Sequence, residues 1–110
     1  MSSTRRAKIT FCGQPCGELR EIGTGPDRKY EFEYCDSFLK SNYRPLSLNL
    51  PKLNKIFLSS KLFGIFEGLA PEGKNREAQA RANGTSPDDL FTLITLIGKH
   101  SDSAIKAESA

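Results

Sequence analysis

The side chains best suited to chemistry in this sequence are a single histidine and three cysteines. His100 stands beside Lys99 without a second histidine for a metal site or a Ser-His relay, so a solvated loop residue is expected. Cys12 and Cys16 have C-x-x-x-C spacing without a second such pair, and Cys35 makes the total odd. This pattern favours free thiols over a disulfide framework or a zinc site.

A glycine-containing turn and a pair of acids are the other candidates for a reactive site. Gly23-Thr24-Gly25 begins like a phosphate loop, but Arg28 stands where the third glycine belongs and a strand follows. Glu67 and Glu72 flank a turn, where acids are usually exposed. The sequence contains no P-loop, nucleophile elbow or kinase catalytic-loop motif. We therefore expect no enzyme activity, no catalytic residue, no metal and no cofactor.

Length and composition predict one domain, residues 1–110, with flexible tails at 1–6 and 107–110. No apolar run approaches the roughly 18 residues of a membrane-spanning helix, and no signal-peptide pattern is present, so a cytoplasmic location is expected. The net charge of +3 is dispersed, and only Arg5, Arg6 and Lys8 form a cluster. This dispersal argues against direct contact with nucleic acid.

The first half of the chain predicts mostly strands. Alternating or short apolar runs indicate strands at 7–12, 18–22 and 28–34, with a hairpin turn at 13–17. Asp36 is expected to cap one or two helical turns that end near Asn42. Leu46, Leu48 and Leu50 alternate between two prolines, which predicts a short strand at a sheet edge.

The stretch from Ser59 to Gly73 predicts a short helix followed by a fixed corner. Ser59 or Ser60 is a candidate cap, and Gly68 followed by Pro71 predicts the C-terminal stop. The predicted core stripe at i, i+3, i+4 and i+7 consists of Leu62, Ile65, Phe66 and Leu69. Phe63 points roughly 100° away from the centre of that stripe, so it is either a rim of the core or an exposed contact for a partner.

Two further helices and a strand are predicted after the corner. Residues 72–83 predict a polar helix that buries little, so it either lies at the surface, which is the default, or makes its main contacts with another molecule. Ser86 and Pro87 predict the start of a helix over 88–97, which is apolar on most sides, should be the most buried helix and should end at Gly98. Residues 103–107 predict a last strand. The predicted fold is therefore α+β: a small twisted antiparallel sheet, a hairpin plus edge strands, packed with three to four short helices.

Several short sequence motifs follow one another in a fixed order along nearly the whole chain. They are Gly17-Glu18-Leu19, Phe32-x-Tyr34, the run from Tyr43 to Pro51, the run from Phe66 to Gly73 with Arg76, and Asp89-x-Phe91-x-Leu93 leading to Gly98. In these motifs the sequence resembles the small N-terminal domain of HipA-type serine/threonine kinases, the toxins of bacterial toxin–antitoxin systems. A kinase core of several hundred residues follows this domain in the family. Because the present sequence contains the small domain without such a core, it most resembles HipS, the stand-alone small subunit of tripartite HipBST systems.

The resemblance implies a single HipA N-terminal-like domain that acts as an antitoxin, binding and neutralising a separately encoded HipA-like (HipT-type) kinase. It also implies a helix-turn-helix HipB-type protein in the same complex. HipS-like subunits can present a bulky aromatic before the Pro-Glu-Gly corner; because this chain lacks Trp, Phe63 or Phe66 would serve. The expected kinase-binding residues are Phe63, Phe66, Glu67, Glu72 and Arg76.

Other roles stay open at this point. One alternative is an accessory domain of a split kinase that aids complex assembly or DNA autoregulation without being the inhibitor. The others are a fragment of a complete kinase and a nucleic-acid contact module beside a helix-turn-helix partner.

The sequence departs from the family pattern at two places. Gln79 replaces the Leu of the family's Arg-x-x-Leu-Ala motif, and the segment 98–104 lacks the second glycine of the family's ending. Both departures lie where the domain would meet a kinase core.

Overall fold

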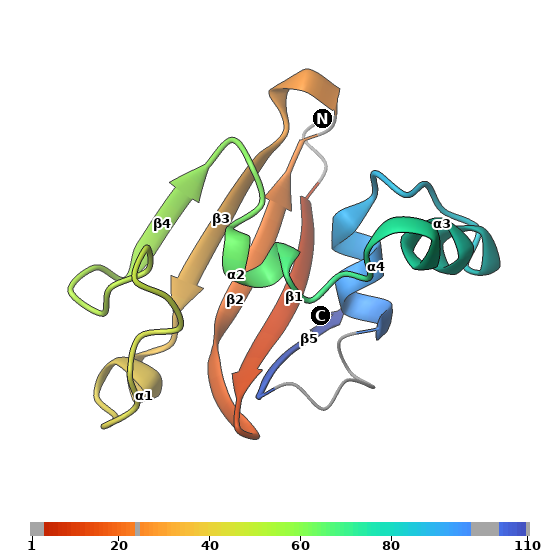
Figure 1. Cartoon of the computed structure of the whole chain (residues 1–110). Helices are drawn as coiled ribbons and strands as arrows, with labels where there is room; N and C mark the ends of the chain where they lie inside the picture. Colours follow the sequence, from red (N-terminus) through yellow and green to blue (C-terminus); the bar gives the residue numbers. More distant parts are fainter. Residues whose placement is uncertain (1–3, 24, 98–103, 110) are drawn as a thin grey trace.

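The computed structural model describes residues 4–23, 25–97 and 104–109, and it shows a five-stranded antiparallel sheet with helices (Figure 1). The strands are β1 (Thr4–Phe11), β2 (Gln14–Ile22), β3 (Lys29–Tyr34), β4 (Ile56–Ser59) and β5 (Ile105–Ser109). The helices are η1 (Gly25–Asp27), α1 (Asp36–Leu39), α2 (Gly64–Glu67), α3 (Gly73–Ala82) and α4 (Leu90–Ile97). The strand order is β4-β3-β2-β1-β5. The predicted α+β fold is confirmed.

The first two strands form the predicted hairpin, but its turn is shorter than expected. Cys12 and Gly13 alone make the turn, and both have positive φ, 50° and 81°. That combination matches the right-handed twist of paired strands. The expected turn at 13–17 is therefore wrong from Gln14 onward, because those residues already pair in β2, and a register shift after Ile9 accommodates them.

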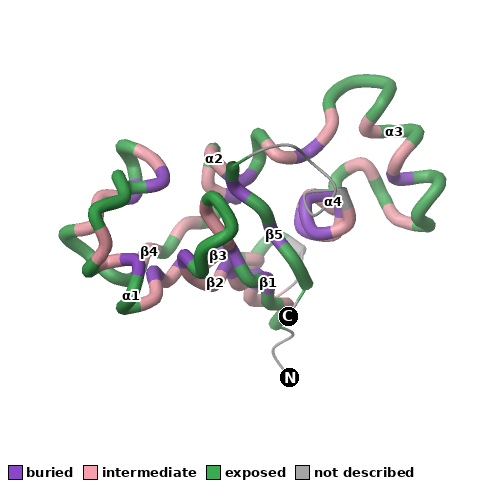
Figure 2. Tube along the Cα trace, turned by 90° about the horizontal axis from the view of Figure 1, so that it is seen from below, coloured by how far each residue is buried: buried purple, intermediate pink, exposed green. Residues whose placement is uncertain are grey.

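One face of the sheet carries the core and the other carries charge. The strand residues that point inward are almost fully buried, and they include Ala7, Ile9, Leu19, Tyr30, Phe32, Tyr34, Ile105 and Ala107. Helices α2 and α4 lie on this side, as Figure 2 shows. Phe66 of α2 and Ile94 of α4 complete the same cluster. The period-two alternation of the strands thus decides which face is covered.

Helix α4 is strongly buried, as predicted, but it begins later than predicted. Phe91, Leu93, Ile94 and Thr95 are buried. The start is set by Asp89, whose Oδ1 accepts a hydrogen bond from the Thr92 amide at 3.3 Å. Ser86, the expected cap, instead accepts from the amide of Asp88 in a preceding turn. The predicted end at Gly98 and the loop residue His100 lie outside the described residues.

The leucine-rich segment 46–50 is not the predicted edge strand. It forms a turn, in which the Leu50 amide donates to the Ser47 carbonyl at 3.0 Å. The Tyr34 hydroxyl holds both ends, because it accepts from the Leu46 amide at 3.1 Å and donates to the Leu50 carbonyl. Leu48 is consequently fully exposed. The edge strand beside β3 is β4, at 56–59, which was not among the predicted strands.

The remaining elements agree with the predictions in kind and differ in detail. Helix α1 begins after Cys35 without a side-chain cap. Asp36 accepts a hydrogen bond from Lys55 Nζ at 2.9 Å instead of capping the helix. Helix α3 occupies the predicted polar stretch and buries only Ala80. The last strand, β5, pairs with β1, so residues 4–6 and 107–109, expected in tails, belong to strands. No helix in the described ranges is long and apolar enough to cross a membrane.

Candidate partner-binding site

The segment from Leu62 to Glu72, expected to meet a partner, lies over the inner face of the sheet (Figure 1). Its helix, α2, is one turn long and starts at Gly64, later than the predicted start at Ser59 or Ser60. Ser59 instead ends β4, and its hydroxyl accepts from the Lys61 amide at 3.1 Å. The residue that precedes the helix is Phe63, which has extended backbone angles and no side-chain cap.

Phe66 belongs to the core and not to the surface. Its side chain is fully buried, and its ring lies 5.2 Å from that of Phe32 in β3, measured between centroids. A partner therefore has no access to it while the domain is folded. Of the predicted stripe, Leu62 is also buried, whereas Ile65 and Leu69 are half-buried. The structure thus removes Phe66 from the candidate kinase contacts.

Phe63 is half-buried and borders an open groove. Its ring packs edge-on against Phe66, with centroids 6.2 Å apart and an interplanar angle of 84°. The groove has a volume of about 350 Å³ and runs between the 47–50 turn, β4 and the start of α2. Gly64 lies beside it with an exposed backbone, and a Cβ there would meet nothing within 4 Å. A side chain from a partner therefore has room to contact Phe63.

The expected acidic neighbour of Phe63 lies at a different hollow. Glu67 is exposed and lines a second space of about 330 Å³ with Arg28, Lys61 and Leu90. Helical i, i+4 spacing would have put Glu67 and Phe63 on one face. Because Phe63 is extended and precedes the helix, that spacing does not fix the direction of its side chain. A single partner side chain therefore does not meet both residues in one hollow.

The last two predicted contacts lie at the corner before α3. Glu72 is the exposed residue that precedes the helix, and its side chain makes no cap. Arg76 is half-buried, and its Nε donates to the Pro71 carbonyl at 2.8 Å. This bond fixes the corner, so Arg76 has a structural role in the isolated domain. The Arg76 amide donates to the Glu72 carbonyl at 3.3 Å, and neither residue lines the groove beside Phe63.

Sequence reasoning missed a set of exposed apolar side chains, of which Leu58 lines this groove. They are Leu48, Leu53, Ile56 and Leu58, with exposed fractions of 100%, 94%, 52% and 69%. The run Ile56-Phe57-Leu58 between polar residues is a signal that could have indicated β4. Leu48 gave no such signal, because its alternation with Leu46 and Leu50 predicted an inward side chain. Exposed apolar clusters mark protein contacts more often than isolated apolar residues do.

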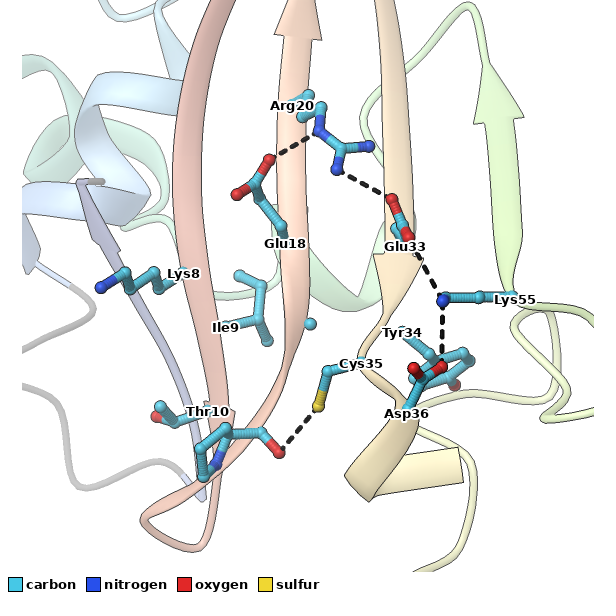
Figure 3. A pocket seen from close by; sticks show the side chains of 12 residues that line it. Lys8, Ile9, Thr10, Glu18, Arg20, Glu33, Tyr34, Cys35, Asp36 and Lys55 are labelled. Atoms are coloured by element: carbon cyan, nitrogen blue, oxygen red, sulfur yellow. Dashed lines mark hydrogen bonds and ion pairs between the residues drawn. The ribbon is translucent and has the colours of Figure 1, made fainter. Parts of the chain in front are cut away.

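The outer face of the sheet holds a charged hollow of about 460 Å³, shown in Figure 3. Arg20 lies among three carboxylates, with Nε 2.6 Å from Glu18 Oε1 and Nη2 2.8 Å from Glu33 Oε1, and it also contacts Glu31. The hydrogen bond from Arg20 lowers the pKa of Glu33, and the same bond raises that of Arg20. Lys55 pairs with Glu33 and Asp36. Each of these charged groups has a partner of opposite sign, which indicates a structural network.

The three cysteines are free thiols, as predicted. Burial raises the pKa of the Cys16 thiol to about 12. A thiol with so high a pKa is protonated at neutral pH and is a poor nucleophile. Cys35 Sγ lies 3.4 Å from the Pro15 carbonyl oxygen, as Figure 3 shows. These features suit a packing role for Cys16 and Cys35, whereas Cys12 is exposed.

Comparison with known proteins decides the family. The model of the family described as HipA N-terminal domain matches residues 7–107. The chain belongs to the HipA N-terminal domain family. This HipA N-terminal domain resembles a solved structure described as the N-terminal domain of HipA toxin, with a TM-score of 0.66, 23% identity, and coverage of 96% of this chain and 92% of that one. At that identity the likeness shows the fold.

A longer relative matches part of the domain. The protein named "Putative kinase Y4mE" from Sinorhizobium fredii is 37% identical over 68 residues, which cover 61% of this chain. The same residues cover 16% of Y4mE, so the HipA N-terminal domain corresponds to a small part of that relative. The rest of Y4mE has no counterpart in this alignment.

Proposed function

We propose that this HipA N-terminal domain is a non-enzymatic subunit that binds and neutralises a separately encoded HipA-type serine/threonine kinase. Family membership over residues 7–107 supports the link to such kinases. The name of Y4mE supports a kinase context for domains of this kind. In this proposal the chain has no catalytic residue and takes its effect from contact alone.

The observation that carries the proposal is the exposed apolar surface beside a groove. Leu53, Ile56 and Leu58 are more than half exposed, although apolar side chains are normally buried. The groove with Phe63 at its border adds a concave region to this surface. A surface of this composition is suited to contact with another protein.

Co-expression tests the proposal directly. The chain is expressed together with an active HipA-type kinase from the same genome, and growth, co-purification and phosphotransfer are measured. We expect restored growth, a stable complex and reduced phosphotransfer by the kinase. The purified chain alone should neither hydrolyse ATP nor transfer phosphate.

Three results would contradict this function. If the two chains fail to co-purify, the proposed binding to the kinase is wrong. A complex with undiminished phosphotransfer would support the accessory role in assembly or DNA autoregulation with a helix-turn-helix protein instead. Metal-dependent ATP turnover that persists through purification would show an enzyme.

A further inference from the structure

Strand β4 forms an edge of the sheet (Figure 1). It exposes the apolar side chains of Ile56 and Leu58. Ile56 and Leu58 lie opposite Glu33 and Glu31 of β3 on the outer face. Edge strands usually carry charges that discourage pairing with other chains. The strand at the opposite edge, β5, follows this rule with exposed Lys106 and Glu108, whereas β4 does not.

The backbone of β4 also has free groups on its open side. The Tyr34 amide donates to the Lys55 carbonyl at 2.9 Å, which fixes the alternation of the ladder between β3 and β4. In the same register, Phe57 and Ser59 are the next residues of β4 whose backbone N–H and C=O groups face β3. In an antiparallel pair the intervening residues point their N–H and C=O groups away from the partner strand. Those of Ile56 and Leu58 therefore face the open edge, and no hydrogen bond to them from elsewhere in the described ranges is found.

The groove beside Phe63 runs along this same edge. Its walls include Phe57 and Leu58 of β4, and Leu50, Leu62 and Ile65 lie around it. A strand added beside β4 would alternate its side chains between this groove and the exposed row of Ile56 and Leu58. The exposed row is apolar, whereas the groove joins its apolar walls to the polar side chains of Ser47, Asn49 and Ser59. The central residues of the added strand can therefore be apolar toward the row and either apolar or small and polar toward the groove.

The charge around the edge selects the partner. Residues 37–66 contain no acidic residue and five basic ones: Lys40, Arg44, Lys52, Lys55 and Lys61. Lys55 is paired with Glu33 and Asp36, and Lys52 donates to backbone carbonyls. Lys40, Arg44 and Lys61 form no ion pair with any residue the structure describes. A second copy of this chain would bring like charges together, whereas an acidic segment would complement them.

We propose that the open edge of β4 binds an extended strand of the partner kinase in which apolar residues are flanked by acidic ones. The backbone of Ile56 and Leu58 supplies the pairing, and the groove receives alternate side chains. This is strand addition at a sheet edge, a recurrent mode of peptide recognition. The assignment of the strand to the kinase rests on the proposed function, while the edge itself can be tested without the kinase.

A synthetic peptide tests the edge. Isotope-labelled chain is mixed with a peptide of about ten residues in which a central run of Val is flanked by Glu at both ends, or with the matching peptide flanked by Lys, and amide exchange is followed by NMR. We expect the acidic peptide to slow exchange of the Ile56 and Leu58 amides by roughly tenfold or more. The basic peptide should have no effect, and high salt should weaken the acidic one.

A matched pair of variants separates backbone pairing from side-chain contact. Leu58→Pro removes an N–H that faces the open edge, so the ladder between β3 and β4 is retained. Leu58→Val keeps that N–H and replaces Leu with another apolar side chain, which is β-branched. We expect Leu58→Pro to abolish peptide binding and Leu58→Val to change affinity by less than about threefold. If Leu58→Pro fails to fold, the exchange data on the wild-type chain still decide the question.

Each outcome has a defined meaning. The proposal is overturned if the acidic peptide leaves Ile56 and Leu58 unprotected, if it protects another edge, or if a β4 homodimer forms without peptide. A kinase complex in which these amides exchange as fast as in the free chain also overturns it, although the proposed function would then stand. If the acidic peptide protects these amides but the chain does not bind the kinase, strand addition at the β4 edge is supported and the proposed function is refuted.

Discussion

The guanidinium of Arg5 and the carboxylate of Asp89 form a bidentate ion pair across 84 sequence positions. Nη2 lies 2.8 Å from Oδ1, and Nη1 lies 3.4 Å from Oδ2. The same guanidinium contacts the buried Glu21 at 2.6 Å, so one arginine of β1 joins β2 to the start of α4. Burial alone would raise the pKa of Asp89, but hydrogen bonds from Arg5, Thr92 and Thr85 hold it well below its ordinary 3.8.

The first prediction is that Asp89 makes the fold sensitive to acid. Because its pKa is lower in the folded state, its stabilisation is present above the ordinary value and is lost as pH falls below 3.8 toward the folded value. Asp89→Asn keeps an acceptor for the helix start but removes the charge. It should lower the free energy of unfolding by about 1–3 kcal/mol at neutral pH. The further loss of stability on acidification should then be smaller in the variant than in the wild-type chain. Urea unfolding at a series of pH values measures both effects.

Asp88→Asn is the matched control for this prediction. Asp88 is exposed, and neither oxygen of its carboxylate has a hydrogen bond or ion pair within the described ranges. The change should alter stability by less than about 0.5 kcal/mol, as most surface substitutions do. If both variants lower the free energy of unfolding equally, the ion pair between Asp89 and Arg5 does not stabilise the fold measurably.

The second prediction concerns Ile94 in α4, whose side chain is fully buried against the sheet. Ile94→Ala should lower the free energy of unfolding by about 2–5 kcal/mol, because it removes buried methyl groups and leaves a cavity. Denaturant unfolding measures the change. Leu96→Ala, in the same helix but half-exposed, should cost less. An Ile94 variant with an unchanged melting temperature but no kinase binding would make α4 an interface.

The third prediction concerns Gly17 in β2, which allows a close approach of β3. A Cβ at this position would lie 2.2 Å from the Glu33 carbonyl oxygen, a backbone atom that cannot rotate away. Gly17→Ala should therefore force the strands apart and cost about 1–3 kcal/mol or more. Gly64→Ala is the control, since a Cβ there meets nothing within 4 Å. Thermal unfolding should show a clear loss for the first variant only.

The fourth prediction separates the two aromatic residues at α2. Phe66→Ala should lose about 3–5 kcal/mol of stability, because Phe66 is fully buried beside Phe32. Phe63 is half-buried at the groove, so Phe63→Ala should fold and melt closer to wild type. If Phe63 is a kinase contact, the variant should lose at least about 2 kcal/mol of kinase affinity together with growth rescue.

Melting curves and kinase titrations on both variants provide the measurement. A Phe63→Ala chain that unfolds as readily as Phe66→Ala would make Phe63 a rim of the core. A folded Phe63→Ala chain that still neutralises the kinase would leave the groove without this contact. In either case the interface would have to be sought at other exposed side chains.

Local patterns in the sequence were enough to predict the hairpin, the aromatic strand β3 and the buried helix α4. Tyr30, Phe32 and Tyr34 alternate with charged residues, and alternation in a strand directly gives one buried and one exposed face. Helix α4 is apolar on most sides, so its burial followed from composition. Its start could not be read locally, because Ser86 and Asp89 are both good caps, and Arg5, far away in sequence, pairs with Asp89 and not with Ser86.

The tertiary structure alone decided the edge of the sheet and the candidate site. The alternation of Leu46, Leu48 and Leu50 fits a strand, but the Tyr34 hydroxyl bonds the backbone at Leu46 and Leu50 and holds the segment as a turn. That arrangement leaves the edge to β4. Helical spacing likewise placed Phe63 with Glu67, whereas the extended backbone at Phe63 lets it border the groove along β4. Period and propensity are properties of neighbouring residues, but an edge or a groove depends on which distant segments take up the remaining hydrogen bonds and core space.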